Sequence, residues 1–589
     1  MITRQEQKIE NTWKLEDIYS DDSQFEKEYE LLEKELDHFQ NYKGKLEQNR
    51  ILLEALQAYE TINYYFGRIY VYANQRNHQD ATNSTYQNLS GKAQLMAVKV
   101  SQKTSWFEVE ILKLDSIDSQ ELKKYHRFLE MIFRRKEHVL DEKTEALLAR
   151  ASDLSNTADS IYSMFNDADL QFEDCMDEMG NPHPLTHGNY ISYMESKDRT
   201  LRKSAFEKLY KEYEQFNHSL SAMYYANCKQ ALFFSKEHLY NSTLECELFS
   251  NEIPLEVYDN LIQTVHDHLN TMYEYVQLRK EILGYESLHM YDLYVPLTPS
   301  INKKYTFEQA KEIVKEGLKP LGQDYINLLE EGFNNRWIDV YENKGKRTGA
   351  YSWGCYGCHP FVLLNYNETL NDVFTLAHEM GHALHTYYSN SSQFILDSDY
   401  RIFVAEVAST CNESLLIQYL LKNTEDKEEK IYLLNYLLDQ FKSTMYRQTM
   451  FAEFEKITHD LVNQNEVLTS DTLNQIYYDL NKKYYGDAIF IDSQIQYEWS
   501  RIPHFYTPFY VYQYATSFAA AIAISTKILN QEEGIVDKYK TFLKGGCSKD
   551  PISLLKQCGI DMSKPDAIEQ SLEVFKQYVH QLEELIHEN

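Results

Sequence analysis

The chain has 589 residues, of which 90 are acidic and 59 are basic, so its formal charge is −31 at pH 7. Such an excess of negative charge repels phosphate groups, which argues against nucleic acid and anionic membrane as partners. The first residues lack the apolar core of a signal peptide, and the most apolar run, residues 518–524, is too short to cross a bilayer. We therefore expect a soluble, cytoplasmic protein.

Glycine and proline are scarce, at 19 and 11 residues, and no Pro/Ser/Gly-rich tract or repeat divides the chain. We therefore expect short connections and a compact, helical organisation. The eight cysteines are scattered, as free thiols would be in a large chain without a secretion signal. Cys355 and Cys358 have the CxxC spacing of redox and zinc motifs, but no second CxxC accompanies them, which favours two more free thiols.

The N-terminal part of the chain has helical patterning. Residues 1 to about 160 form Glu-, Lys-, Leu- and Tyr-rich segments with charges three or four apart, which is typical of solvated helix faces over an apolar stripe. Between residues 167 and 190, short strand-like pieces flank Gly180-Asn181, and this predicts a small hairpin.

Helical patterning then resumes. Long antiparallel helices are predicted over residues 205–235 and 255–283, the second ending at Gly284. A capping box from Thr306 to Gln309 predicts the start of a further helix.

The stretch 349–367 departs from this pattern. Residues 361–366 are apolar and partly β-branched and follow Pro360, so they predict a strand that leads into the next helix. An exposed edge there could pair with an extended peptide backbone, whereas a strand that only packs fits the sequence equally well.

The next helix carries a metal-binding motif. Thr369 and Asp372 have the spacing of a capping box, so the helix starts a few turns before the histidines. His378 and His382 are four residues apart, which puts both imidazoles on one helix face at a separation suited to a tetrahedral metal. Glu379 is rotated by about 100° from His378, where its carboxylate could hold a water beside the metal. This is the HExxH pattern.

Apolar residues surround the motif, and a helix that is apolar nearly all round is buried. They are Val373, Phe374, Leu376, Ala377, Met380, Ala383 and Leu384. Buried histidines and a buried carboxylate need partners, so we favour a metal site over an exposed polar face. His385 falls on the same face at i+7, but a fourth protein ligand would close the site, so we do not expect it to bind the metal.

A third ligand is expected downstream. Residues 403–416 predict a second helix, in which Glu406 interrupts an apolar run, and a carboxylate there is costly unless it is coordinated or paired. Glu406 follows His382 by 24 residues, enough for a turn and a returning helix. His378, His382 and Glu406 would leave one zinc position for water. Glu413, two turns further on, could hydrogen-bond a ligand imidazole or be an ordinary polar position.

A late segment, residues 499–514, concentrates hydrogen-bond donors on aromatic rings. Breaks at Pro503 and Pro508 predict a loop that enters a helix. Tyr510 and Tyr514 are four residues apart and share a helix face.

Three stretches resemble the oligoendopeptidase F family, a branch of the thimet-oligopeptidase-like zinc peptidases. They are Gly349-Ala-Tyr-Ser-Trp-Gly-Cys-Tyr356, Phe374-Thr-Leu-Ala-His-Glu-Met-Gly-His-Ala-Leu-His385 and Phe403-Val-Ala-Glu-Val-Ala-Ser-Thr-Cys-Asn-Glu413. Further pieces agree, at Trp13–Tyr19, Leu288–Pro296 and Arg501–Tyr506, so the resemblance spans the whole chain.

The resemblance implies a mainly α fold, with a two-lobed helical body around a deep substrate channel and a small β-sheet beside the zinc helix. We expect an N-terminal helical region with the hairpin, residues 1–195, and a zinc metallopeptidase domain, residues 196–589. Such a channel admits short unstructured peptides and excludes folded proteins.

The resemblance also implies that a His and two Tyr residues late in the chain face the zinc and stabilise the oxyanion. It assigns these roles to His504, Tyr510 and Tyr514. The spacing differs from the thimet branch by about two residues, so Tyr506 or Tyr512 could replace one of the tyrosines. Aromatic packing is the alternative for each.

We therefore expect a zinc-dependent endopeptidase with one zinc per chain, in which Glu379 is the general base for the attacking water. Its partners would be short peptide substrates; the sequence does not predict its oligomeric state. Two alternatives stay open: an intracellular zinc amidohydrolase that acts on a non-peptide amide, and a catalytically inactive zinc-binding helical scaffold. Glu379 argues against the scaffold, because a purely structural site does not need it.

Overall fold

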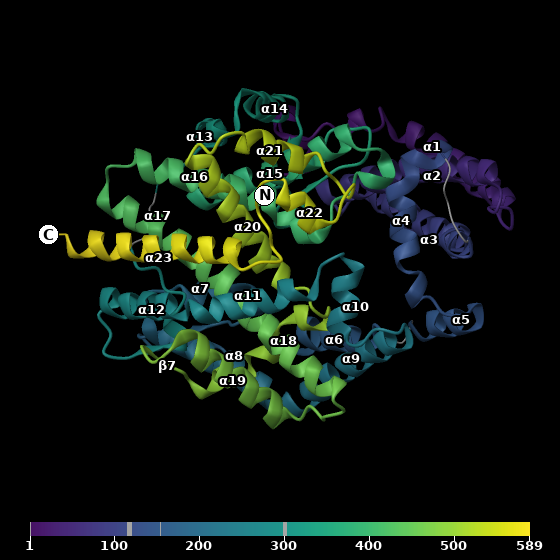
Figure 1. Ribbon diagram of the computed structural model, residues 1–589. Helices are drawn as coiled ribbons and strands as arrows, with labels where there is room; N and C mark the ends of the chain where they lie inside the picture. The colour runs from purple at the N-terminus through teal and green to yellow at the C-terminus, as the bar shows by residue number, and fades with distance from the viewer. Residues whose placement is uncertain (1, 115–119, 153–154, 299–302, 589) are drawn as a thin grey trace. The chain divides into compact units, whose positions relative to one another are not determined.

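The computed structural model describes residues 2–114, 120–152, 155–298 and 303–588. It is mainly helical (Figure 1). The chain divides into two compact units, each built from three stretches of the sequence. Unit 1 contains Met1–Glu137, Lys303–Leu420 and Ile524–Ile560, and unit 2 contains His138–Asn302, Leu421–Ala523 and Asp561–Asn589. The mainly α fold class is confirmed, whereas the domain boundary after residue 195 stays a prediction.

The elements of unit 1 include the HExxH helix, α15. They are α1 (Asp22–Phe39), α2 (Asn49–Gln79), α3 (Ser84–Leu112), α4 (His126–Arg134), α13 (Phe307–Leu318), α14 (Gln323–Asn334), β4 (Ile338–Asp339), β5 (Tyr351–Trp353), β6 (Phe361–Leu363), α15 (Leu370–Ser392), α16 (Ile402–Asn423), α21 (Ile535–Leu543) and α22 (Pro551–Lys556). In Figure 1, α15 lies among α13, α14, α16 and α21.

Unit 2 holds the remaining elements. They are α5 (Glu142–Ala151), α6 (Thr157–Met164), β1 (Cys175–Met176), β2 (Pro182–His183), α7 (His187–Met194), α8 (Arg199–Gln215), α9 (Asn217–Glu237), α10 (Thr243–Ser250), α11 (Leu255–Asp267), α12 (Leu269–Leu283), β3 (Leu288–His289), α17 (Lys427–Gln440), α18 (Arg447–Asn463), α19 (Ser470–Tyr485), β7 (Ile489–Phe490) and α23 (Asp566–His587). α20 (Tyr512–Leu529) crosses the boundary between the units at residue 523.

Several local predictions are confirmed. β1 and β2 pair antiparallel and form the predicted hairpin. α12 ends at Gly284, which adopts a left-handed conformation, and the Thr306 capping box opens α13. The prolines after residue 502 are followed by α20, as the predicted loop requires.

The two long helices expected in unit 2 are each broken. The first divides into α8 and α9 at Phe216, and the second into α11 and α12 at His268. The His268 Nδ1 atom lies 2.9 Å from the Thr264 carbonyl oxygen. In an unbroken helix, this oxygen would accept a hydrogen bond from the backbone amide of His268. Asn217 is the first residue of α9. Its buried side-chain Oδ1 atom accepts a hydrogen bond from Asn474 Nδ2, at 2.9 Å. Apolar periodicity continues through both breaks and therefore does not predict them.

A small sheet lies beside α15, as predicted. It has the order β4-β6-β5, with β4 parallel and β5 antiparallel to β6. The strand predicted over residues 361–366 is shorter, at Phe361–Leu363, and it is the central strand, with no free edge for a peptide. β5 is an edge strand of this sheet. Its Trp353 carbonyl accepts a hydrogen bond from Gln75 Nε2, at 3.2 Å.

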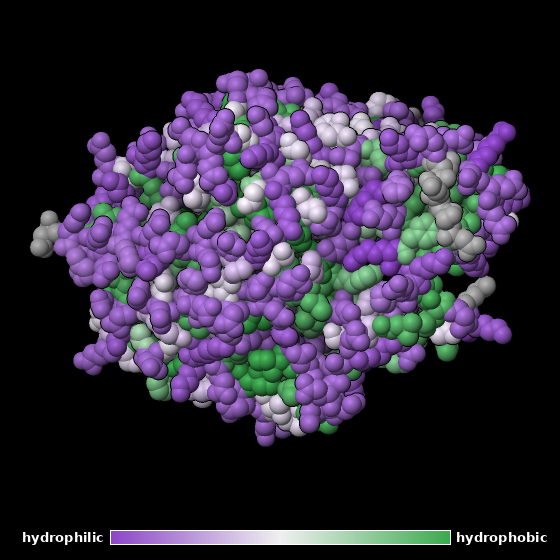
Figure 2. Space-filling view, in the orientation of Figure 1, coloured by the Kyte–Doolittle hydropathy of each residue, from purple (hydrophilic) through white to green (hydrophobic). Residues whose placement is uncertain are grey.

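α15 is a buried helix with a defined start. The Thr369 amide donates to Asp372 Oδ2, at 2.9 Å, and the Asp372 amide donates to Thr369 Oγ1, at 3.2 Å, which confirms the capping box. The seven apolar residues that surround the motif are all at most 2% exposed. The face of the molecule in Figure 2 is by contrast largely hydrophilic, and among the described residues no helix is long and apolar enough to cross a membrane.

Candidate metal centre

The structure brings His378, His382 and Glu406 together. The two imidazoles lie one turn apart on α15, and Glu406 is on α16. The Nε2 atoms of the histidines are 3.2 Å apart, and Glu406 Oε2 is 3.4 Å from His378 Nε2 and 3.3 Å from His382 Nε2. Within the described part of the chain, no other group of three His, Cys, Asp or Glu residues could hold a metal ion.

The three donor atoms fit a tetrahedral zinc site. Zinc bonds to imidazole nitrogen and carboxylate oxygen are about 2.0–2.2 Å long, and at tetrahedral angles this places two ligand atoms about 3.3 Å apart. The observed separations of 3.2, 3.3 and 3.4 Å agree with that value. The side chains of His378, His382 and Glu406 remain 27, 18 and 33% exposed, so the cluster is open on one side.

The close packing of α15 against α16 sets this geometry. A Cβ on Gly381 would lie 2.6 Å from Ser409 Cα and 2.8 Å from the Ala408 carbonyl oxygen, so only glycine allows this approach. Asn412 Nδ2 donates to the Ala377 carbonyl, at 3.0 Å, inside the core. Sequence reasoning missed Gly381 and Asn412, although a glycine between the two histidines was the available signal for close helix packing.

Two further side chains orient the ligands. Glu413 Oε1 is in hydrogen-bond contact with His378 Nδ1, as one of the two readings of Glu413 predicted. Ser409 Oγ donates to Glu406 Oε2, at 3.0 Å. Sequence reasoning missed Ser409, whose position at i+3 from Glu406 was the available signal. Hydrogen bonds of this kind fix the orientation of a ligand and tune its basicity.

The charges of the cluster are mutually compensating. Burial alone would lower the pKa of His378, but hydrogen bonds to Glu406 and Glu413 raise it well above its usual range. Burial alone would raise the pKa of Glu406, but hydrogen bonds to His378 and His382 bring it below its usual range. Glu406 is therefore an anionic donor, which suits a divalent cation.

Glu379 lies beside this triangle and is not part of it. Its side chain is 7% exposed, and burial raises the pKa of its carboxyl, although His378 and His382 oppose the shift. Its Oε2 atom is buried and makes no hydrogen bond to the described residues. A carboxylate with one uncommitted oxygen and a raised pKa has the properties of a general base.

His385 has a different environment. It is 1% exposed, and its ring is stacked on Tyr400, with centroids 3.7 Å apart and planes 3° from parallel. Burial lowers its pKa to about 3, so it is neutral at physiological pH. It is outside the donor triangle and packs as a core residue.

A second group of predicted residues, His504, Tyr510 and Tyr514, lies together in unit 2. His504 belongs to the short helix Pro503–Tyr506, and Tyr514 is in the first turn of α20. His504 Nε2 is 3.5 Å from the Tyr514 hydroxyl. The Tyr510 ring lies 5.9 Å from that of His504 and 5.5 Å from that of Tyr514. Burial lowers the pKa of His504, which favours its neutral form.

The two alternative tyrosines are engaged in packing. Tyr506 is stacked on Tyr162, with ring centroids 4.4 Å apart. Tyr512 is 1% exposed and lies 5.0 Å from the ring of Tyr258. Whether Tyr506 or Tyr512 replaces Tyr510 or Tyr514 stays a prediction.

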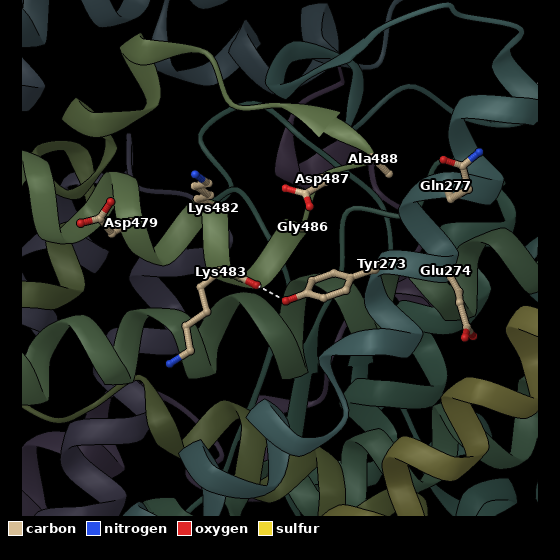
Figure 3. A pocket seen from close by; sticks show the side chains of 9 residues that line it. All are labelled: Tyr273, Glu274, Gln277, Asp479, Lys482, Lys483, Gly486, Asp487 and Ala488. Atoms are coloured by element: carbon tan, nitrogen blue, oxygen red, sulfur yellow. Dashed lines mark hydrogen bonds between the residues drawn. The ribbon is translucent and has the colours of Figure 1, made fainter.

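Unit 2 also has two cavities that do not involve these residues. One, of about 660 Å³, is lined by charged side chains of α12, α19 and the turn after α19, and Figure 3 shows the Tyr273 hydroxyl directed at the Lys483 carbonyl, 2.5 Å away. The other, of about 870 Å³, is lined mainly by α6 and α9 and includes Met164 and Met223. None of the predicted site residues lines either cavity.

Comparison with known proteins identifies the family. The model of peptidase family M3 matches residues 192–574, and that of oligopeptidase F matches residues 113–172. Oligopeptidase PepF of Bacillus subtilis (strain 168) is 44% identical over 591 aligned positions, which cover 99% of this chain and 88% of the relative.

Solved structures agree with this result. The structure of oligoendopeptidase-F from Enterococcus faecium matches with a TM-score of 0.75 and 37% identity, over 96% of this chain and 99% of the other. A structure from Chlamydophila abortus matches with a TM-score of 0.92 and 35% identity, over 99% and 100% of the two chains. The chain is therefore a peptidase that belongs to family M3 and, within it, to the oligoendopeptidase F proteins.

Proposed function

We propose that the chain is a zinc-dependent endopeptidase that hydrolyses short, unstructured oligopeptides. The observation that carries this proposal is the triangle of His378, His382 and Glu406 donor atoms, with Glu379 beside it. Two imidazoles and one carboxylate are a ligand set of catalytic zinc sites, and they leave one position open. We expect one zinc ion per chain.

The roles of the protein side chains follow from their environments. Zinc held by the triangle would polarise the scissile carbonyl and lower the pKa of a water. Glu379, with its uncommitted Oε2 atom, would accept the proton of the attacking water and pass it to the leaving amine. Glu413 would keep the Nδ1 side of His378 occupied, so that Nε2 faces the metal. The reaction needs no covalent intermediate with the protein.

The group of His504, Tyr510 and Tyr514 would stabilise the developing oxyanion. Each has a polar hydrogen to donate, and hydrogen bonds aimed at charge that forms in the transition state lower the barrier selectively. The contact between His504 and Tyr514 supports a shared role, because the imidazole would hold the phenol in one orientation.

The substrate class rests on the family. The relatives are named oligopeptidase and oligoendopeptidase, and we infer the same substrate class, short peptides, for this chain. The cytoplasmic location stays a prediction.

Internally quenched peptides of increasing length would test this function. We expect cleavage at internal bonds of short peptides, located by mass spectrometry of the products, and no cleavage of a folded protein. Turnover of a small non-peptide amide without peptide cleavage would contradict the proposal in favour of an amidohydrolase. Bound zinc without any turnover would indicate a scaffold.

A further inference from the structure

Cys355 and Cys358 lie at the two ends of a tight turn between β5 and β6. The Cys358 amide donates to the Cys355 carbonyl, at 3.3 Å, which closes a four-residue β-turn. Gly357, the third residue of this turn, has a φ of 81°, and glycine adopts such a positive φ readily. The Cα atoms at the ends of a β-turn are less than about 7 Å apart, and most disulfides span about 4.4–6.8 Å. The backbone therefore holds the two residues at bridging distance.

The two thiols have unequal environments. Cys355 is 5% exposed, whereas Cys358 is half-buried and can be reached from solvent. A hydrogen bond from the Cys355 thiol lowers the pKa of Cys358, and the guanidinium of Arg68 lowers it further, although burial opposes the shift. The same hydrogen bond and burial raise the pKa of Cys355. Cys358 is therefore the better nucleophile of the pair, and Cys355 the proton donor.

A metal site is a weaker explanation for the pair. Among the described residues, Cys355 and Cys358 belong to no group of three possible ligands. The neighbouring His359 is already engaged, because Nε2 lies 3.1 Å from Asp17 Oδ2 and Nδ1 lies 2.8 Å from the Pro360 carbonyl oxygen. Both thiols are free, so they are available for oxidation.

We propose that Cys355 and Cys358 are a reversible oxidation site, in which hydrogen peroxide converts the two thiols into an intramolecular disulfide. The Cys358 thiolate attacks one peroxide oxygen, the O–O bond breaks, and the leaving hydroxide takes a proton to become water. The Cys355 sulfur then attacks the sulfenic sulfur of Cys358 and releases its own proton, and the second hydroxide leaves as water. Two thiols are thus oxidised, one peroxide is reduced, and two waters are formed.

The other half-buried cysteines provide internal controls. Cys246 and Cys547 are also half-buried, but burial raises the pKa of each to about 11. The pKa of Cys358 is instead lowered, chiefly by the hydrogen bond from the Cys355 thiol. The gain in thiolate content outweighs the accompanying loss of intrinsic nucleophilicity, so we expect Cys358 to react faster than either control.

Peroxide treatment of the purified full chain, followed by alkylation and peptide mapping, tests the site. We expect one peptide that contains both Cys355 and Cys358 to lose two hydrogen atoms and resist alkylation, and dithiothreitol to restore it. Cys358→Ser should abolish the loss of two hydrogen atoms from this peptide and leave Cys355, whose pKa is raised, open to alkylation. Cys355→Ser should accumulate a sulfenic acid on Cys358, trapped by dimedone. The matched control Cys547→Ser should leave the reaction unchanged.

Two results would overturn the proposal. One is that Cys355 and Cys358 are both still reduced, and can be alkylated, when peroxide has already oxidised Cys246 or Cys547. The other is equal oxidation rates in the parent chain and in Cys358→Ser, with Cys358→Ala as a second variant of the same position. Neither readout depends on peptidase activity, so the test is independent of the proposed function.

Discussion

Replacing Gly381 by alanine should damage the metal site without removing any ligand. The added Cβ would lie 2.6 Å from Ser409 Cα, whereas ordinary contact begins at 3.4 Å, so the α16 backbone must retreat by roughly 3.4 − 2.6 = 0.8 Å. Glu406 is on this helix, three residues before Ser409, and would move with it. Metal–ligand bonds tolerate changes of about 0.2 Å, so the donor triangle should open.

The expected magnitudes follow from this clash. Overpacking a core typically costs about 1–3 kcal/mol in the free energy of unfolding, and disturbance of the groups that support a metal ligand typically costs about 10–100-fold in metal affinity. Zinc affinity would be measured by titrating the metal-free protein against a fluorescent chelator, and stability by denaturant unfolding of the metal-free protein. Both quantities should fall in Gly381→Ala.

Gly67 and Gly91 provide matched controls. Both are inside long helices, α2 and α3, and a Cβ on either would meet no atom within 4 Å. Gly67→Ala and Gly91→Ala should keep the parental zinc affinity and gain about 0.4–1 kcal/mol in stability. Parental zinc affinity and stability in Gly381→Ala would refute the argument that this contact positions Glu406.

Three further predictions concern other parts of the mechanism and the fold. Glu379→Gln should retain zinc and bind peptide but lose turnover, because it removes the proton acceptor and no ligand; retained turnover would move the base elsewhere. Tyr510→Phe and Tyr514→Phe should each lower kcat about 10²–10³-fold with little change in KM, and parental rates in both would assign these rings to packing. Burial lowers the pKa of His459 to about 3, so below pH 6.5 the unfolded chain binds a proton there that the folded chain does not. Stability should therefore fall by up to about 1.4 kcal/mol per pH unit between pH 6.5 and about 3, and His459→Leu should remove that contribution from denaturant unfolding curves; identical pH profiles would contradict it.

The sequence predicted the centre of the fold well because its signals there are local. The capping box at Thr369, the buried helix around the motif and the returning helix with Glu406 depend on spacings of a few residues, and the structure has all three. The contact between Glu413 and His378 was one of two interpretations of the sequence. A polar residue two helical turns after Glu406 is ambiguous until the position of α16 against α15 is known.

Other features depend on contacts that spacing does not encode. The breaks at Phe216 and His268 lie where Asn217 and His268 make side-chain hydrogen bonds, one of them to a residue more than two hundred positions away. The central position of β6 depends on β4, a two-residue strand too short to be recognised in the sequence. The roles of Gly381 and Ser409 become visible only when α16 is seen against α15.

The proposed mechanism requires one zinc ion, held by His378, His382 and Glu406, for peptide cleavage. The most direct test measures zinc content and cleavage of a quenched oligopeptide on one purified sample, before and after a chelator and after zinc is restored. We expect one zinc per chain, loss of metal and activity together, and recovery of both, whereas His382→Ala and Glu406→Gln should bind zinc much more weakly. Full cleavage by the zinc-free protein, or full zinc occupancy in His382→Ala, would contradict the account.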